Sequence, residues 1–188
     1  MIKLEREEFE EYLMRKRVLL LEGEITREKA MDLRRKLLFL SSKSKEEIKI
    51  IIDTPGGEVI AALFLYEFIS HLDAPVVCII NGECSSSGVV VLQGAKKRFA
   101  TESSFFYLHP LAVSFEKEPI VIDERAEERV KDKLRGAEER QKIIYNILIK
   151  KTNRTLEEIK EKENKVIFAK EAKELGLIDE VLPDDYKI

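Results

Sequence analysis

Residues 82–88 read Gly-Glu-Cys-Ser-Ser-Ser-Gly and place hydroxyl groups where a nucleophile is useful. The apolar run 75–80 before them is typical of a buried parallel strand, and the apolar run 89–92 after them fits the buried side of a helix. A serine between the two lies at a helix N-terminus, where free N–H groups and the helix dipole favour negative charge. Acyl transfer needs such a nucleophile beside donors for the oxyanion. A serine-rich helix cap over a tight helix–sheet contact explains the stretch equally well.

Pro55, Gly56 and Gly57 follow the apolar strand predicted at 48–53. Two glycines after a proline let the backbone turn with positive φ and let a ligand approach the amides closely. This turn and Ser86 both follow the carboxyl ends of predicted parallel strands, so they should meet at one edge of the sheet. The amides of Gly57 and Ser87 are therefore candidate donors to a carbonyl attacked by Ser86. A Pro-Gly-Gly sequence alone is more often only a turn.

A serine nucleophile needs a base, and the sequence contains two histidines. His109 ends an extended apolar segment and precedes Pro110, which favours it as the base over a structural role. His71 lies at the end of the helix predicted at 59–70, where surface histidines are ordinary. Cys84 is a rival nucleophile, but its place beside a buried strand suits a structural thiol better.

Strands and helices alternate along the predicted chain, which indicates right-handed crossovers and a mainly parallel sheet. Strands are expected at 18–21, 48–53, 75–80 and 177–182, with short extended segments at 96–100 and 105–110. Thr26 is expected to cap the helix before a polar loop at 41–47. Thr155 opens a capping box, and Gly176 ends a helix predicted at 168–175.

A long, charged helix is predicted from Asp123 to Lys151, with Gly136 as a candidate bend. A helix of this length extends beyond so small a core, and its apolar stripe then needs a partner, most simply a second copy of the chain. The alternative is a solvated helix with a narrow core-facing stripe. Residues 1–16 form a short helix or arm, and the absence of repeats or linkers predicts one domain over 1–188.

The composition is that of a globular protein, with 44% hydrophobic and 37% charged residues in 188. A net charge of −3 from 33 basic and 36 acidic residues argues against nucleic acid or an anionic membrane as main partner. The two cysteines fall in or beside one strand, which favours a reducing, cytoplasmic setting over a disulfide framework. Neither a signal peptide nor a membrane span is expected. We expect no cofactor and no metal ion.

Taken together, these motifs resemble those of the proteolytic subunit of the Clp protease. The resemblance covers roughly residues 12–183 and implies the Clp/crotonase-type fold. That fold is α/β, with a mainly parallel sheet, flanking helices and a projecting handle region at about 105–151. The residues that carry it are 52–59, 82–88, 97–100, His109 with Pro110, 152–157, Phe168 and 172–179.

The resemblance also implies the roles of single residues. Ser86 becomes the nucleophile and His109 the general base, with an oxyanion hole formed by the amides of Gly57 and Ser87. The long helix corresponds to the handle through which two rings of seven subunits close a chamber. Substrate peptides or unfolded proteins are expected to lie extended beside the handle strand.

Three departures from the family pattern stand out. The triad aspartate of the family lies two residues before the phenylalanine matched by Phe168, and Val166 occupies that position here. Glu163, Asn164 or a handle residue is a possible substitute, and the sequence selects none of them. The segment between His109 and Thr152 is several residues longer than usual.

The third departure concerns the ATPase partner of the family. The aromatic positions that dock an unfoldase in family members are Lys49 and Ile51 here, and the N-terminal arm is short. A standard AAA+ unfoldase partner is therefore doubtful on sequence grounds.

The sequence thus favours a serine endopeptidase that works through an acyl-enzyme on Ser86 inside a ring-shaped homo-oligomer. Its main alternative is a catalytically impaired, Clp-like scaffold subunit, supported by Val166. A second is a crotonase-like acyl-CoA enzyme, in which pairing Ser86 with His109 has no purpose. A third is a Ser–Lys peptidase, which requires Lys96 or Lys97 to reach Ser86.

Overall fold

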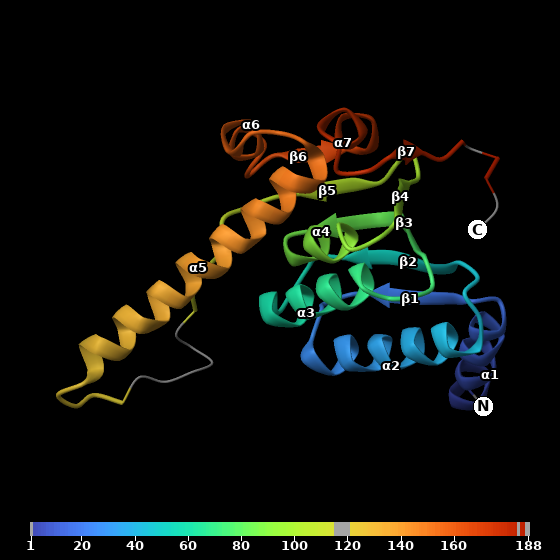
Figure 1. Cartoon of the computed structure of the whole chain (residues 1–188), viewed down its shortest axis with the longest axis horizontal. Helices are drawn as coiled ribbons and strands as arrows, with labels where there is room; N and C mark the ends of the chain where they lie inside the picture. The colour runs from blue at the N-terminus through green and yellow to red at the C-terminus, as the bar shows by residue number, and fades with distance from the viewer. Residues whose placement is uncertain (1, 115–120, 184, 187–188) are drawn as a thin grey trace.

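A mainly parallel β-sheet forms the centre of the protein in a computed structural model that describes residues 2–114, 121–183 and 185–186 (Figure 1). Its strands are β1 (Val18–Glu22), β2 (Ile48–Thr54), β3 (Val76–Ser85), β4 (Lys97–Ala100), β5 (Phe105–Tyr107), β6 (Val166–Phe168) and β7 (Glu180–Val181). Hydrogen-bonded neighbours follow the order β1-β2-β3-β4-β7, while β5 pairs with β3 and with β6. The β5–β6 pair is antiparallel, and the other described pairs are parallel.

Helices cover this sheet and extend from it, as Figure 1 shows. They are α1 (Ile2–Arg15), α2 (Arg27–Lys43), α3 (Val59–Ser70), α4 (Ser87–Leu92), α5 (Ala126–Thr152), α6 (Leu156–Glu161) and α7 (Ala169–Leu175). The predicted caps are confirmed. The Thr26 side chain accepts from the amide of Lys29 at 3.2 Å, Thr155 forms a capping box with Glu158, and Gly176 ends α7 at φ 84°.

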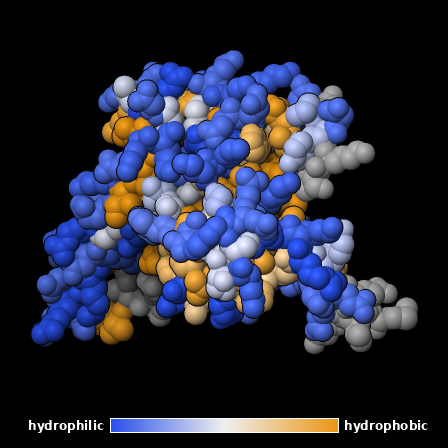
Figure 2. All heavy atoms as spheres, turned by 45° about the vertical axis from the view of Figure 1, so that its right-hand side comes forward, coloured by the Kyte–Doolittle hydropathy of each residue, from blue (hydrophilic) through white to orange (hydrophobic). Residues whose placement is uncertain are grey.

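The core lies around β2 and β3: the first half of β3 is buried on both faces of the sheet, and β2 is fully buried on one face. Residues 76–80 of β3 are all buried, as are Ile48, Ile50 and Ile52 of β2. A strand covered on both faces needs a continuous apolar run, which is why β3 was recognisable from sequence. The space-filling view shows mostly hydrophilic side chains on the face that it presents, with hydrophobic groups gathered in a few places (Figure 2).

Several predicted boundaries were wrong. Helix α2 continues to Lys43 into the predicted polar loop, and Ser44 ends it by donating its amide to the Leu40 carbonyl. The last strand comprises only Glu180–Val181, because its partner β4 offers a short edge at Phe99 and Ala100. Strand β6 was not predicted at all. It exists because its backbone pairs with β5, and no local pattern reports a contact between segments so far apart in the sequence.

Helix α5 begins at Ala126, three residues later than predicted, and continues through Gly136 to Thr152. The helix projects well beyond the sheet (Figure 1). Its apolar side chains Leu134 and Ile143 are 43% and 47% exposed, whereas Ile147 and Leu148 near its C-terminal end are buried. Leu134 and Ile143 are nine positions apart and so lie on opposite sides of the helix, which means that these exposed apolar side chains do not form one continuous stripe. No helix in the described part of the chain is long and apolar enough to cross a membrane.

Arg98 connects β4 to the segment that follows α7. Its guanidinium contacts Asp179 at 2.5 Å and the Gly176 carbonyl at 2.9 Å, and it also donates to the side chain of Gln93. The Arg98 side chain is only 11% exposed, and Asp179 is 42% exposed. The pair thus holds the C-terminal segment against the sheet.

Replacing Arg98 with alanine is expected to lower the free energy of unfolding by about 2–3 kcal/mol, because it leaves buried acceptors without a donor. Chemical denaturation of the variant measures this loss. Lys97→Ala, on the exposed neighbouring position of β4, is the matched control and should change stability by less than about 0.5 kcal/mol. Equal stabilities of the two variants would contradict the assigned role of Arg98.

Candidate active site

Ser86 lies in a strained turn between β3 and α4. Its backbone angles are φ 53° and ψ −125°, and its amide donates to the Tyr107 carbonyl at 2.7 Å. Such a conformation costs a non-glycine residue about 1–3 kcal/mol and is found mainly where function requires it. A sharp strand-to-helix turn of this kind exposes the serine hydroxyl of nucleophile elbows in hydrolases.

The loop of Gly56 and Gly57 approaches Ser86 from the end of β2. Both glycines have positive φ, 98° and 148°. A Cβ on Gly56 would lie 2.7 Å from the Cβ of Ser86, and a Cβ on Gly57 would lie 2.3 Å from the Ile25 carbonyl oxygen. Only glycine fits at either position, because the contacts are with backbone or with Ser86 itself. The Thr54 hydroxyl shapes the turn by accepting from the Gly56 amide at 3.1 Å.

Gly57 and Ser87, whose backbone amides are the candidate oxyanion donors, both lie beside Ser86. Within the described residues the Gly57 amide donates no hydrogen bond, because the neighbouring bonds to Ile25 involve the Gly56 carbonyl and the Glu58 amide. Ser87 is the first residue of α4, and the amides of a first turn have no partner within the helix. The Ser87 hydroxyl donates to the Gly57 carbonyl at 3.2 Å and so holds the two loops together.

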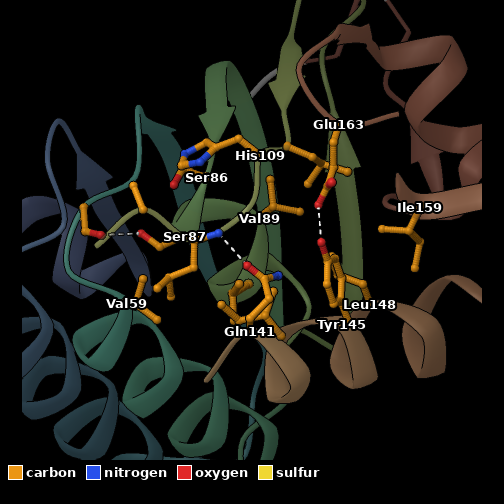
Figure 3. A pocket seen from close by; sticks show the side chains of 16 residues that line it. Val59, Ser86, Ser87, Val89, His109, Gln141, Tyr145, Leu148, Ile159 and Glu163 are labelled. Atoms are coloured by element: carbon orange, nitrogen blue, oxygen red, sulfur yellow. Dashed lines mark hydrogen bonds between the residues drawn. The ribbon is translucent and has the colours of Figure 1, made fainter. Parts of the chain in front are cut away.

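His109 follows β5, which runs beside the end of β3. Figure 3 shows its ring lying next to the Ser86 hydroxyl. No hydrogen bond joins the two side chains in the described structure. Instead the Nδ1 atom of His109 lies 2.7 Å from the Pro110 carbonyl oxygen. The Tyr107 ring supports the imidazole at a centroid distance of 6.0 Å.

A pocket of about 170 Å³ opens beside these residues (Figure 3). One face of α5 forms much of its wall through positions spaced three or four residues apart, which lie above one another on a helix. Those positions are Gln141, Ile144, Tyr145 and Leu148. Val59, Val89, Leu108 and Ile159 add further apolar wall. The pocket can therefore accept an apolar side chain next to the serine.

The position expected to hold an acid offers none. Val166 is 53% exposed and lies opposite Tyr107 in the β5–β6 pair. Glu163 lines the pocket, but its carboxylate accepts the phenol hydroxyl of Tyr145 at 2.7 Å. Burial and this bond raise the pKa of Tyr145 above its ordinary value. The Asn164 side chain lies 3.5 Å from the Tyr107 hydroxyl.

The structure separates the other sequence candidates from Ser86. Lys97 pairs with Val77 at the start of β3, whereas Ser86 follows the end of that strand. Eight residues of strand correspond to about 26 Å, which a lysine side chain does not span. Lys96, one residue earlier, is farther still, so the Ser–Lys arrangement is wrong. His71 lies at the opposite end of α3 from the pocket and contacts the Glu67 carbonyl at 2.8 Å.

Cys84 is fully buried and unsuited to attack. Burial raises the pKa of its thiol well above the ordinary value, and it raises that of Cys78 to about 12. A buried thiol that stays protonated is a poor nucleophile. No group of three or more possible metal-binding side chains occurs among the residues that the structure describes.

Sequence reasoning missed the contribution of α5 to this site. Gln141 and Tyr145 line the pocket only because the C-terminal half of the long helix packs against α4 and the segment after β5. The apolar spacing of the long helix predicted a covered face, but the sequence assigned that face to a second copy of the chain or to the core in general and not to the pocket beside Ser86. Glu163 was one of three open candidates for the acid, and its bond to Tyr145 was not foreseen.

A substitution at Gly57 tests whether the close packing of its loop against Ile25 is needed for activity. Gly57→Ala is expected to displace the loop and to lower any hydrolytic activity by about 10²-fold, since a misplaced oxyanion donor costs about that much. Gly136→Ala is the matched control. Its Cβ would meet only the flexible end of Arg140 at 3.3 Å, so activity should be retained. Steady-state hydrolysis by both variants measures the difference, and equal rates would exclude a role for the Gly57 amide.

A serine in a strained turn, a neighbouring histidine and two candidate amide donors make up a candidate serine hydrolase site, and its scaffold is the α/β fold of the Clp/crotonase type. Comparison with known proteins agrees. The family model described as Clp protease matches residues 5–185. The chain belongs to the Clp protease family.

Individual relatives give the same result. The chain is 33% identical over 177 residues to the ATP-dependent Clp protease proteolytic subunit 1 of Rhodopirellula baltica, covering 90% of this chain and 74% of that protein. The structure of the present chain is similar to that of a ClpP1 mutant from Listeria monocytogenes, with a TM-score of 0.81. That match covers 94% of this chain and 97% of the other at 23% identity, and it supports the fold alone.

Proposed function

We propose that the protein is a serine endopeptidase that cleaves peptide bonds through an acyl-enzyme on Ser86. The observation that carries this proposal is the meeting of the strained Ser86 turn, the His109 ring and the amides of Gly57 and Ser87 at one apolar pocket. The three parts follow three strands of the sheet, β2, β3 and β5. Acyl transfer uses all three, whereas a helix cap needs neither the histidine nor the glycine loop.

The reaction follows from the groups present. The Ser86 Oγ attacks the carbonyl carbon of the scissile bond, and the His109 Nε2 accepts the hydroxyl proton. The amides of Gly57 and Ser87 stabilise the oxyanion of the tetrahedral intermediate. Collapse breaks the C–N bond, and His109 gives its proton to the leaving amine. Water, deprotonated by His109, then attacks the acyl carbon. The bond from that carbon to Ser86 Oγ breaks, His109 returns the proton to Oγ, and the acid product leaves.

Family membership implies protein substrates and oligomeric rings, and we infer that this chain forms a ring-shaped homo-oligomer as a single Clp-like domain over 1–188. The projecting part of α5, with Leu134 exposed on it, provides a contact surface for a second copy. Two stacked rings of seven are the family arrangement proposed here. Residues 111–114 carry no strand, and 115–120 lie outside the described residues, so the expected handle strand has no counterpart in the described part.

The scaffold-subunit alternative draws on Val166, since no carboxylate binds the His109 ring in the described structure. An acyl-CoA enzyme has less support, because the matching family is that of the Clp protease and a histidine adjoins Ser86.

Labelling with a small fluorophosphonate tests the proposal, because this probe needs neither an unfoldase nor an open chamber. The adduct is located by mass spectrometry of the purified oligomer, with His109→Ala measured in parallel. Labelling of Ser86 that His109→Ala slows by several orders of magnitude is the expected result. An intact oligomer that takes up no probe would favour the scaffold subunit.

A further inference from the structure

The peptide unit between Pro110 and Leu111 connects His109 to helix α5. Its carbonyl oxygen, from Pro110, lies 2.7 Å from His109 Nδ1. Its N–H, from Leu111, donates to the side-chain oxygen of Gln141. The C=O and N–H of a trans peptide point to opposite sides, and no described peptide bond is cis. The acceptor on Gln141 therefore fixes the direction in which the Pro110 carbonyl points.

This carbonyl determines which nitrogen of His109 carries the proton. A carbonyl oxygen only accepts hydrogen bonds, so the Nδ1 atom beside it must be the protonated nitrogen. The Nε2 atom then keeps its lone pair, which is the form that a general base for Ser86 requires. The carboxylate of a triad fixes the same tautomer through the same nitrogen.

The segment that bears this peptide is fixed by its neighbours. The Tyr107 carbonyl accepts from the Ser86 amide, and the Leu108 carbonyl accepts from the Asn164 amide, both at 2.7 Å. Proline at 110 also restricts the local backbone. These contacts leave the Pro110 carbonyl as the acceptor directed at His109.

Other polar groups near His109 are engaged elsewhere. The Glu163 carboxylate binds the Tyr145 hydroxyl at 2.7 Å, and Val166 is apolar. Tyr107 contacts the imidazole through its ring rather than its hydroxyl. Among the residues that the structure describes, no carboxylate is hydrogen-bonded to the His109 ring.

We propose that the Pro110–Leu111 peptide takes the orienting role of the missing triad carboxylate, and that Gln141 is a positioning residue that acts through this peptide. The inference rests on the proposed peptidase function and names the missing third member of its site. A neutral carbonyl holds the tautomer but gives the imidazolium less stabilisation than a carboxylate does. The His109 ring is thus oriented without a carboxylate, through a peptide that a side chain of the projecting helix holds in place.

Nitrogen-15 NMR of the imidazole tests the tautomer directly. The His71→Gln variant, expressed without a histidine tag, leaves His109 as the single histidine of a chain that contains two. We expect Nδ1 to carry the proton and Nε2 to be bare at a pH where the ring is neutral. A ring protonated on Nε2 would overturn the proposal whether or not the protein hydrolyses peptides.

Variants of Gln141 test the positioning role. Gln141→Ala is expected to lower kcat by about 10- to 100-fold with little change in KM, the cost typical of a misplaced catalytic group. It should also mix the two tautomers in the NMR spectrum. Gln141→Glu keeps an acceptor for the Leu111 amide and should restore the Nδ1–H form and much of the rate. Asn146→Ala, exposed on the same helix, is the matched control.

A kcat of Gln141→Ala equal to that of Asn146→Ala would overturn the role of Gln141. Circular dichroism and size-exclusion chromatography show whether each variant folds and assembles. If Gln141→Ala does not fold, the spectrum of His71→Gln still decides the tautomer. Failure of the proposed function has a different signature. The wild-type protein would then neither cleave peptides nor take up fluorophosphonate, while the Nδ1–H tautomer would still be present.

Discussion

Replacing Ser86 with alanine is expected to lower peptide hydrolysis by about 10⁴-fold and to abolish fluorophosphonate labelling. The serine hydroxyl is the group that forms the acyl-enzyme, and the loss of a nucleophile is the largest single effect in such sites. The residual rate would come from the amides of Gly57 and Ser87 and from substrate binding. Initial rates with a fluorogenic peptide, measured at matched oligomer concentration, determine this loss.

The serine run provides its own control. Ser85 precedes the nucleophile, and its buried Oγ has no hydrogen-bond partner in the described structure. Ser85→Ala removes this unsatisfied hydroxyl, so stability should be unchanged or higher by about 1 kcal/mol. Activity should stay within about twofold of wild type. If Ser85→Ala were as inactive as Ser86→Ala, the loss would reflect the fold of the turn and not the nucleophile.

Replacing Val166 with aspartate is expected to raise kcat by about 10²-fold. Val166 lies directly opposite Tyr107 in the β5–β6 pair, so the two side chains share one face. His109 follows Tyr107 by two residues, and alternate residues of an extended segment point the same way. A carboxylate at position 166 is therefore a diagonal neighbour of the imidazole. It would add the charge stabilisation that the Pro110 carbonyl lacks.

The exposure of Val166, 53%, means that a polar side chain there removes little apolar burial. Val166→Asn is the matched control, because it has the size of aspartate without the charge. It should leave kcat near the wild-type value. Single-turnover acylation rates of the three proteins measure the effect. An aspartate variant no faster than the asparagine variant would show that position 166 does not reach His109.

These two experiments bear on different parts of the site. The Ser86 variant tests whether chemistry occurs, and the Val166 variant tests what limits it. Helix α5 links this question to assembly, because Gln141, Tyr145 and Leu148 line the pocket while Leu134 and Ile143 remain exposed farther along the helix. A partner that packs on the exposed part of α5 would contact the same helix whose Gln141 binds the Leu111 amide.

Much of this site could be found from sequence because its signals are local. A continuous apolar run marks a strand buried on both faces, as in β3, and a serine run directly after such a strand marks a turn. Gly56 and Gly57 were recognisable since the backbone there needs angles that other residues avoid. The caps at Thr26, Thr155 and Gly176 involve partners only a few residues away, so the local sequence predicts them.

Contacts between distant segments had to come from the tertiary structure. Strand β6 is three residues long and exists through its pairing with β5, so its own pattern was too short to reveal it. The Tyr145–Glu163 bond joins residues 18 positions apart, and the Leu111–Gln141 bond joins residues 30 apart. Such bonds depend on how the helices pack on the sheet. The residue types at these positions do not by themselves specify that packing.

The sequence by itself thus determined the chemistry that this chain has available, a serine, a histidine and glycine-bearing turns at strand ends. Only the tertiary structure decided how His109 is held and which lysines and cysteines are excluded from the site. The physical reason is the separation in sequence between the residues that interact. Backbone conformation and capping are set by adjacent residues, whereas the orientation of an imidazole ring depends on a carbonyl fixed in turn by a side chain from a distant helix.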